Sequence, residues 1–358
     1  LYFNPEAAEG VPLSNLTGLG GFTNGEIARS SGRNLRIYRA RLFLRQSWGF
    51  GGESAVVESA ANQLSGRQDR RRLVLTAGNL SILDLFDANA YSHDPRTQFL
   101  NWSLVTHGAF DFAADARGYT WGAALEWFHD DWAVRAGRFV VPKEPNQQVL
   151  DPQIMNHYGD QAEVEHAHEI GHQPGKLRVL VFRNRARMSR FADALQLGSL
   201  SGAAPDINLV RTSDQTKRGF GISLEQTLTA QVGLFARGSW ADGRTEAYSY
   251  TEIDRSVSAG LQVRGGGWGR EADVAGIALA RNGLSSEHRN YLAAGGAGFF
   301  IGDGRLSYRP ESVFEAYYDA QLARSLRVAF DFQRVDNPAY NADRGPVSVV
   351  STRLHVEF

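Results

Sequence analysis

The chain has 358 residues, with 38 Lys+Arg against 39 Asp+Glu and a formal net charge of −1. This balance excludes a nucleic-acid binder of the usual basic kind, and the absence of cysteine excludes disulfides, cysteine-zinc sites and thiol catalysis. The sequence contains no run of 18 apolar residues, so it predicts no transmembrane helix. No basic segment leads into an apolar run, so we expect any export signal to lie outside this chain.

Strict alternation of apolar and polar residues dominates the sequence, as expected for half-buried strands. Short tracts with turn-forming residues separate many of these segments, and longer loops fall at 50–69, 84–118, 141–161, 186–217 and 283–311. We predict about thirteen strands that pair as hairpins. In chain order they begin near Leu35, Arg72, Tyr119, Trp132, Ala162, Leu177, Phe220, Val232, Ser256, Val274, Val313, Leu326 and Val347.

Two all-β architectures fit many long antiparallel strands: a water-soluble sandwich or propeller, and a transmembrane barrel with a lipid-facing apolar side. Aromatic residues at strand ends and the alternation of short turns with long loops favour the barrel. A propeller needs a repeated motif of about 40–50 residues, which this chain lacks. The last segment, Arg353–Phe358, alternates and ends on Phe, and it resembles the assembly signal of bacterial outer-membrane proteins.

Several blocks of sequence resemble the carbohydrate-selective porin family of OprB type. The most specific block runs from Leu83 to Trp102, and the others follow it in family order. The corroborating blocks are Arg117–Gly122, Arg183–Met188, Thr251–Ser256, Tyr291–Gly296, Phe300–Leu306 and Asn337–Asn341.

This resemblance implies one outer-membrane domain over residues 1–358, a 16-stranded antiparallel barrel for passive diffusion of mono- or oligosaccharides, with no catalysis and no cofactor. The expected partners are carbohydrate solutes, outer-membrane lipid, the barrel assembly machinery through Phe358, and a second copy in a homo-oligomer. Another small nutrient or an amphipathic lipid is the alternative cargo. Since about thirteen strands are evident, either further strands lie upstream of Leu1 or weak ones are hidden, with Leu13–Phe22 as the weakest stretch.

Arginine placement predicts which strand face lines the lumen. Arg39, Arg41 and Arg45 alternate along one strand face, and an arginine facing lipid at the bilayer midplane costs roughly 2–4 kcal/mol. The arginine face is therefore expected to point inward. The residues expected on the lipid-facing side include Tyr119, Trp121, Leu125, Trp127, Leu234 and Leu261. The same argument applies to Arg135, Arg237, Arg264 and Arg327, which could simply pair with Glu126, Glu225 and Asp331 along a solvated wall.

The loop from Asp84 to Arg117 is the main candidate for a constriction, because loops beyond about 12–15 residues are usually functional or disordered. A sugar site needs fork-like donors, carboxylate acceptors and an aromatic face. We expect this loop to fold into the lumen with its apolar residues against the wall; bracing the barrel is the alternative role. The candidate residues are Asp87, Asn89, His93, Asp94, Arg96, Trp102 and Arg117, together with Arg39, Arg41, Arg45 and Glu126.

One catalytic motif competes with the channel interpretation. His168, Glu169 and His172 match H-E-x-x-H, which binds zinc only when both histidines share a helical face. Pro174 and Gly175 follow at once and would stop a helix. We therefore predict that His168 and His172 lie on a strand and its turn. His166 and His168 would share a strand face, either as plain rim residues or as a surface metal pair.

Overall fold

The computed structural model describes residues 1–26, 32–249 and 251–358, and it is built almost entirely from antiparallel strands. Fourteen strands form one sheet in which each pairs with its neighbours along the chain, apart from an inserted hairpin of β3 (Ser54–Val57) and β4 (Gly66–Asp69). The sheet consists of β1 (Tyr2–Gly10), β2 (Gly32–Gly49), β5 (Arg72–Leu80), β6 (Thr120–His129), β7 (Trp132–Phe139), β8 (Tyr158–Ile170), β9 (Gln173–Arg187), β10 (Asp214–Thr227), β11 (Val232–Ala241), β12 (Arg255–Gly265), β13 (Arg270–Gly283), β14 (Glu311–Ala323), β15 (Leu326–Asp336) and β16 (Val347–Val356).

All thirteen predicted strands are present, so the all-β prediction is confirmed. The additional sheet strand is β1, whereas the stretch suspected of hiding one holds a short 3-10 turn, Leu13–Leu16. Long connections contain the helices α1 (Trp102–Val105), α2 (Phe191–Ser201) and α3 (Ser286–Ala293), which the alternation did not predict. None of the helices in the described residues is both long enough and apolar enough to cross a membrane.

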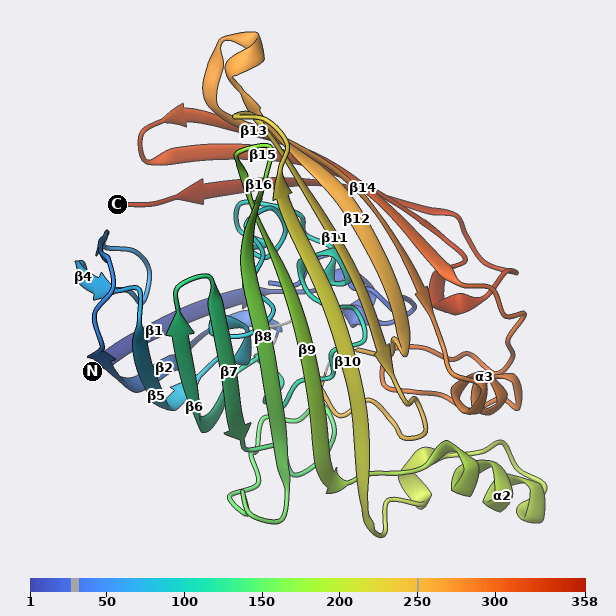
Figure 1. Ribbon diagram of the computed structural model, residues 1–358. Coiled ribbons are helices and arrows are strands. Elements are labelled where there is room, and N and C mark those ends of the chain that lie inside the picture. Colours follow the sequence, from blue (N-terminus) through green and yellow to red (C-terminus); the bar gives the residue numbers. More distant parts are fainter. Residues whose placement is uncertain (27–31, 250) are drawn as a thin grey trace.

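The sheet curls around an interior, and its connections divide between two rims (Figure 1). Short turns join β6 to β7, β8 to β9, β10 to β11 and β14 to β15 at one rim, where both chain ends also lie. The opposite rim carries long loops, including those with α2 and α3. Within the described residues no ladder pairs β1 with β16.

The outward face of the sheet is apolar and exposed, as predicted. Trp121, Leu125 and Trp127 on β6 are 40, 45 and 44 % exposed and alternate with inward Ala124 and Glu126. Leu234 and Leu261 also lie on this face, half-buried between neighbouring strands.

Tyr119 was predicted on the outward face, and that prediction is wrong. The ring is buried and its hydroxyl donates to Glu6 at 2.7 Å. Since β6 begins at Thr120, the alternation of the strand does not extend back to this residue.

Arg39 is a second correction, because it does not share the inward face of Arg41 and Arg45. A register shift at Asn4/Pro5 places Pro5 opposite Arg39, and the guanidinium of Arg39 lies 5.0 Å from the outward Trp121 ring. Pro5 has no N–H to donate and is tolerated on an edge strand or at a bulge. The extra residue in β2 therefore reverses the faces at this point.

Candidate functional site

The connection from β5 to β6 folds into the interior of the curled sheet, where it appears in teal in Figure 1. It begins with the 3-10 turn Ile82–Asp84, closed by a capping box between Ser81 and Asp84. Its apolar side chains Leu85, Phe86, Phe99, Leu100 and Trp102 are all buried. The predicted packing of this loop against the wall is therefore confirmed. We call residues 81–119 the inner loop.

Buried ion pairs attach the inner loop to one wall. Asp87 is fully buried: its carboxylate accepts from Arg237 Nε at 3.2 Å and from the His107 N–H at 2.6 Å. Its own N–H donates to Glu163 Oε2 at 2.8 Å. The N–H of Ala90 likewise donates to Glu225. These contacts join the loop to β8, β10 and β11.

Glycines on the wall make room for this attachment. A Cβ on Gly221 would lie 2.6 Å from the ring of His107, and one on Gly233 would overlap the ring of Tyr91. Both glycines occupy inward positions of β10 and β11. The inner loop can therefore approach the strand backbone closely, and part of the high glycine content serves this packing.

The opposite wall holds the loop through backbone groups. Leu100 and Asn101 donate their N–H groups to Glu315 on β14 at 2.5 and 2.9 Å. Arg353 on β16 donates to the carbonyls of Pro95 and Gln98 at 2.8 and 3.0 Å. Because the loop also contacts β1 through Arg96, it spans the space between the first and last strands of the sheet.

Between these attachments lies a cavity of about 230 Å³ beside β2, which we call the inner cavity. Residues from both rims border it: Gly25 and Glu26 from the long-loop rim, and Ala61 and Asn62 from the β3–β4 connection. Five predicted site residues line it, namely Arg41, His93, Asp94, Arg96 and Trp102.

Arg96 is the most accessible charge of the inner cavity, with 44 % of its side chain exposed. Its Nη2 lies 3.5 Å from Glu6 Oε1 and 3.4 Å from Glu26 Oε2, beyond the optimal hydrogen-bond range. The Asp94 carboxylate does not pair with this guanidinium. It accepts instead from the Arg96 N–H at 2.9 Å and from Thr97 Oγ1, and so shapes the turn after Pro95.

Arg41 forms a fixed wall of the same cavity. Its guanidinium binds Asp84 through two bonds of 2.7 Å and reaches Glu6 at 3.3 Å. Glu6 also accepts from the hydroxyls of Tyr38 and Tyr119. The guanidinium of Arg41 and the carboxylate of Asp84 therefore line the cavity, with Glu6 and two phenol hydroxyls behind them, and these two charged groups can bond to the hydroxyls of a sugar.

The other predicted site residues lie elsewhere. Asp87 and Asn89 are buried in the wall contacts, where Asn89 Nδ2 donates to Ser223 at 3.3 Å. Glu126 is buried on the inward face of β6, where it pairs with Arg135. Arg45 binds Thr76 and the carbonyl of Asn62, and Arg117 stacks on Tyr38 at 4.5 Å.

Sequence reasoning missed Glu6, Glu26, Asp84, Tyr38 and Tyr119 as site residues. Glu6 belongs to β1, which was not predicted as a strand. In the structure the residues of β1 alternate in exposure, and the strand pairs with the arginine-rich strand β2. Asp84 was considered only as a loop boundary. No local signal joins Glu26 to Arg96, because 70 residues separate them.

The histidine motif does not form a zinc site. His168 lies on β8 and its Nε2 contacts Gln226 Oε1 at 3.0 Å, whereas His172 occupies the turn with φ 62°. The prediction of a strand and its turn is confirmed. In the described part of the chain, no cluster of three His, Asp or Glu side chains is arranged to hold a metal ion.

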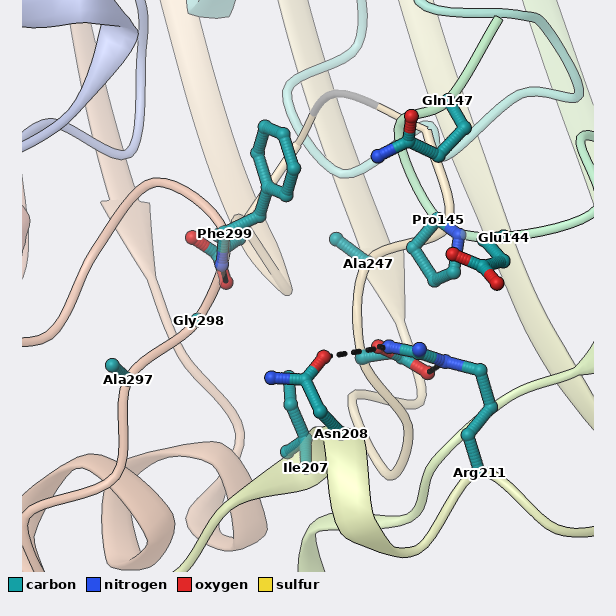
Figure 2. Close-up of a pocket in the computed structure, with 12 residues that line it drawn as sticks. Glu144, Pro145, Gln147, Ile207, Asn208, Arg211, Ala247, Ala297, Gly298 and Phe299 are labelled. Atoms are coloured by element: carbon teal, nitrogen blue, oxygen red, sulfur yellow. Dashed lines mark hydrogen bonds and ion pairs between the residues drawn. The ribbon is translucent and has the colours of Figure 1, made fainter. Parts of the chain in front are cut away.

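A second cavity, of about 260 Å³, opens among four long loops at the long-loop rim. Figure 2 shows Arg211 beside Asn208, with Phe299 across the space from Pro145. Arg211 binds Glu246 through bonds of 2.8 and 2.6 Å. Burial raises the pKa of Glu252 at its edge, although His288 and the N–H groups of residues 299–301 favour the carboxylate. This cavity offers polar groups at the entrance to the interior.

Comparisons with known proteins identify solved structures that are similar to this chain. A high-pH structure of Pseudomonas putida OprB is similar with a TM-score of 0.68 and 16 % identity, over 94 % of this chain and 76 % of that one. A low-pH structure of the same protein gives 0.46 and 13 %, over 90 % and 67 %. The Acinetobacter baumannii channel DcaP gives 0.43 and 10 %, over 92 % and 88 %. None of the curated proteins compared matches the chain in sequence.

The family model for carbohydrate-selective porins, OprB family, matches residues 1–358, and the chain therefore belongs to that family of outer-membrane β-barrel channels.

Proposed function

We propose that this outer-membrane channel admits mono- or oligosaccharides by passive diffusion, and that they pass the inner cavity on the way. The arrangement of Arg96 carries the proposal. Its guanidinium is half-exposed and held by two carboxylates at 3.4–3.5 Å. Pairs of this length exchange readily with other partners, since exposed ion pairs contribute only about 0–1 kcal/mol.

A neutral sugar suits these groups better than an ion. Arg41 and Arg96 are each balanced by carboxylates, so the cavity offers hydrogen-bond donors and acceptors with little net field. A sugar hydroxyl can replace water at these groups with little net change in free energy. Contacts that are weak and spread over several groups let a solute enter and leave, which conduction requires.

Single-channel conductance tests the proposal. The protein is inserted into planar bilayers and mono- and oligosaccharides are added stepwise, with Arg96→Ala beside the wild type. We expect saturable block of the wild-type current by sugar, with weaker block and higher conductance in Arg96→Ala. Arg334→Ala, on the outward face of β15, is the matched control and should behave as wild type.

Two results would contradict the proposal. If no sugar alters the current and a charged nutrient or an amphipathic lipid blocks it, the cargo is of another class. If sugar blocks the wild type and Arg96→Ala equally, carbohydrate passes but the inner cavity is not its contact site.

A further inference from the structure

A row of charged side chains crosses the outward face of four neighbouring strands near the long-loop rim. Arg138 on β7 lies opposite Asp160 on β8, Asp160 lies opposite Arg183 on β9, and Arg183 lies opposite Arg218 on β10. Further along β9 the outward positions are Arg185 and then Arg187, both exposed. We call these six residues the charged row.

The charged row holds five arginines and one carboxylate, Asp160. Two neighbouring carboxylates, Asp214 opposite Arg187 and Asp242 bonded to the Arg218 N–H, reduce the positive charge but leave an excess. Asp160 accepts two bonds from Arg138, of 2.7 and 3.0 Å, and one from Arg183 at 2.6 Å, so its carboxylate is fully engaged. Arg183 and Arg218 face each other directly, and like charges in that position are destabilising. Neither Arg187 nor Arg218 makes an ion pair with any residue that the structure describes.

The height of the charged row on the barrel is defined by the strands themselves. Along the outward face of β9, Leu177, Val179 and Val181 precede Arg183 towards the long-loop rim. On β10 the exposed Phe220 and Ile222 occupy the matching positions. In outer-membrane barrels short turns face the periplasm and longer loops the exterior. The charged row therefore stands where the apolar band meets the head groups of the outer leaflet.

An apolar hollow of about 690 Å³ lies next to the charged row. Two residues along each strand from the charged row, towards the short-turn rim, the outward cross-strand neighbours are Leu125, Ala136, Ala162 and Val181. The two alanines are small between larger flanking side chains, so the surface is recessed there. Arg138, Asp160 and Arg183 border the same hollow.

We propose that the hollow and the charged row bind a phosphate-bearing lipid of the outer leaflet. The lipid phosphate would lie beside Arg187 and Arg218, whose side chains make no ion pair with a described residue, and beside Arg183, which shares Asp160 with Arg138. One acyl chain would occupy the recess over Ala136 and Ala162. The guanidinium groups of the charged row match the oxygens of a phosphate. The hollow is apolar and faces the bilayer, so it suits an acyl chain of the same lipid.

The test measures lipid binding by the detergent-purified full chain. Purified lipid A, its dephosphorylated form and inorganic phosphate are added in turn, and binding is followed by native mass spectrometry and by the thermal unfolding midpoint. We expect lipid A to bind and raise that midpoint, with little effect from the other two. Arg187→Ser combined with Arg218→Ser should weaken binding roughly tenfold or more, at about 1 kcal/mol for each basic residue at an anionic surface.

Two further variants separate the contributions. Arg281→Ser combined with Arg334→Ser removes two outward arginines from β13 and β15 near the same rim and should leave binding unchanged. Ala136→Leu combined with Ala162→Leu fills the hollow and should weaken binding without altering the charged row.

The proposal is overturned if both double arginine variants lose lipid equally, or if inorganic phosphate protects as well as lipid A. It is also overturned if filling the hollow leaves lipid bound but separates an oligomer, because the hollow would then be a contact between copies. None of these outcomes depends on which solute the channel carries.

Discussion

Both sides of the inner loop contain arginine–carboxylate pairs, but the pairs are buried on one side and partly exposed on the other. On the wall side, Arg237 and Asp87 are both fully buried, and every charge has a close partner. On the cavity side, Arg96 is half-exposed and its partners Glu6 and Glu26 lie at the limit of ion-pair distance. The first arrangement holds the loop in place, and the second leaves charges able to exchange partners with a passing solute. Burial therefore distinguishes the side of this segment that anchors it from the side that solvent reaches.

Breaking the wall side should have the largest effect. Arg237→Ala leaves the Asp87 carboxylate buried without its main cation, and such a loss typically costs about 3–5 kcal/mol. We expect lower resistance to urea and a larger, noisier conductance as the loop leaves the wall. Urea unfolding in detergent and bilayer recordings measure the two effects. Arg281→Ala, an exposed outward arginine of β13, is the control, and equal stability of the two variants would show that the wall pair does not hold the loop.

The next effect concerns Glu6, which joins the two kinds of region. It accepts from the buried Arg41 and from both phenol hydroxyls, and it also faces Arg96. Glu6→Gln keeps the shape but removes the charge, so Arg41 and Arg96 lose part of their balance. We expect selectivity to shift towards anions and sugar block to weaken, while unfolding changes by about 1–2 kcal/mol. Reversal potentials in a salt gradient measure this shift. An unchanged ion preference would show that Glu6 does not face the path of the ions.

Changing Arg96 itself should affect function far more than stability. A half-exposed pair contributes about 1 kcal/mol or less, so Arg96→Ala should unfold almost as the wild type does. Its sugar block should nevertheless weaken, as measured by conductance. Arg96→Lys sharpens the comparison. One nitrogen, Nη2, contacts both Glu6 and Glu26, which an ammonium can also do, but lysine cannot present a planar fork of donors to a solute. Full sugar block in Arg96→Lys would show that charge alone, rather than fork geometry, contacts the solute.

The fold was more predictable from sequence than the site. Alternation is repeated along each strand, so thirteen segments could be recognised. β1 was missed because its residues include Pro5 and two alanines, which weaken the alternation of apolar and polar side chains. The bulge that turns Arg39 outward leaves the sequence pattern unchanged, since only pairing with β1 reveals it. The burial of the apolar anchors Phe86 and Trp102 was predicted from composition. The meeting of Arg96 with Glu6 and Glu26 depends on tertiary placement across three segments, which no local pattern encodes.

The smallest expected effect concerns His157 at the long-loop rim, which lies between two carboxylates and which we call the His157 clamp. A change of pH can remove the charge of this histidine without any substitution. His157, next to the start of β8, donates from Nδ1 to Asp151 at 2.7 Å and from Nε2 to Asp214 at 3.0 Å. Burial opposes its charged form, but these bonds outweigh burial and raise its pKa, while Asp151 has a lowered pKa that Lys143 also favours.

Because the folded pKa of His157 lies above its unfolded value of about 6.5, the clamp contributes fully below that pH and is lost as the pH rises through the folded pKa. Hydrogen exchange of residues 140–157 should therefore quicken modestly between pH 6 and pH 9, after correction for the intrinsic rate. His157→Gln should exchange at the faster corrected rate at both pH values, while the inner loop, held by Arg237, stays protected throughout. A pH response that persists in His157→Gln would show that His157 is not the group whose titration loosens this loop.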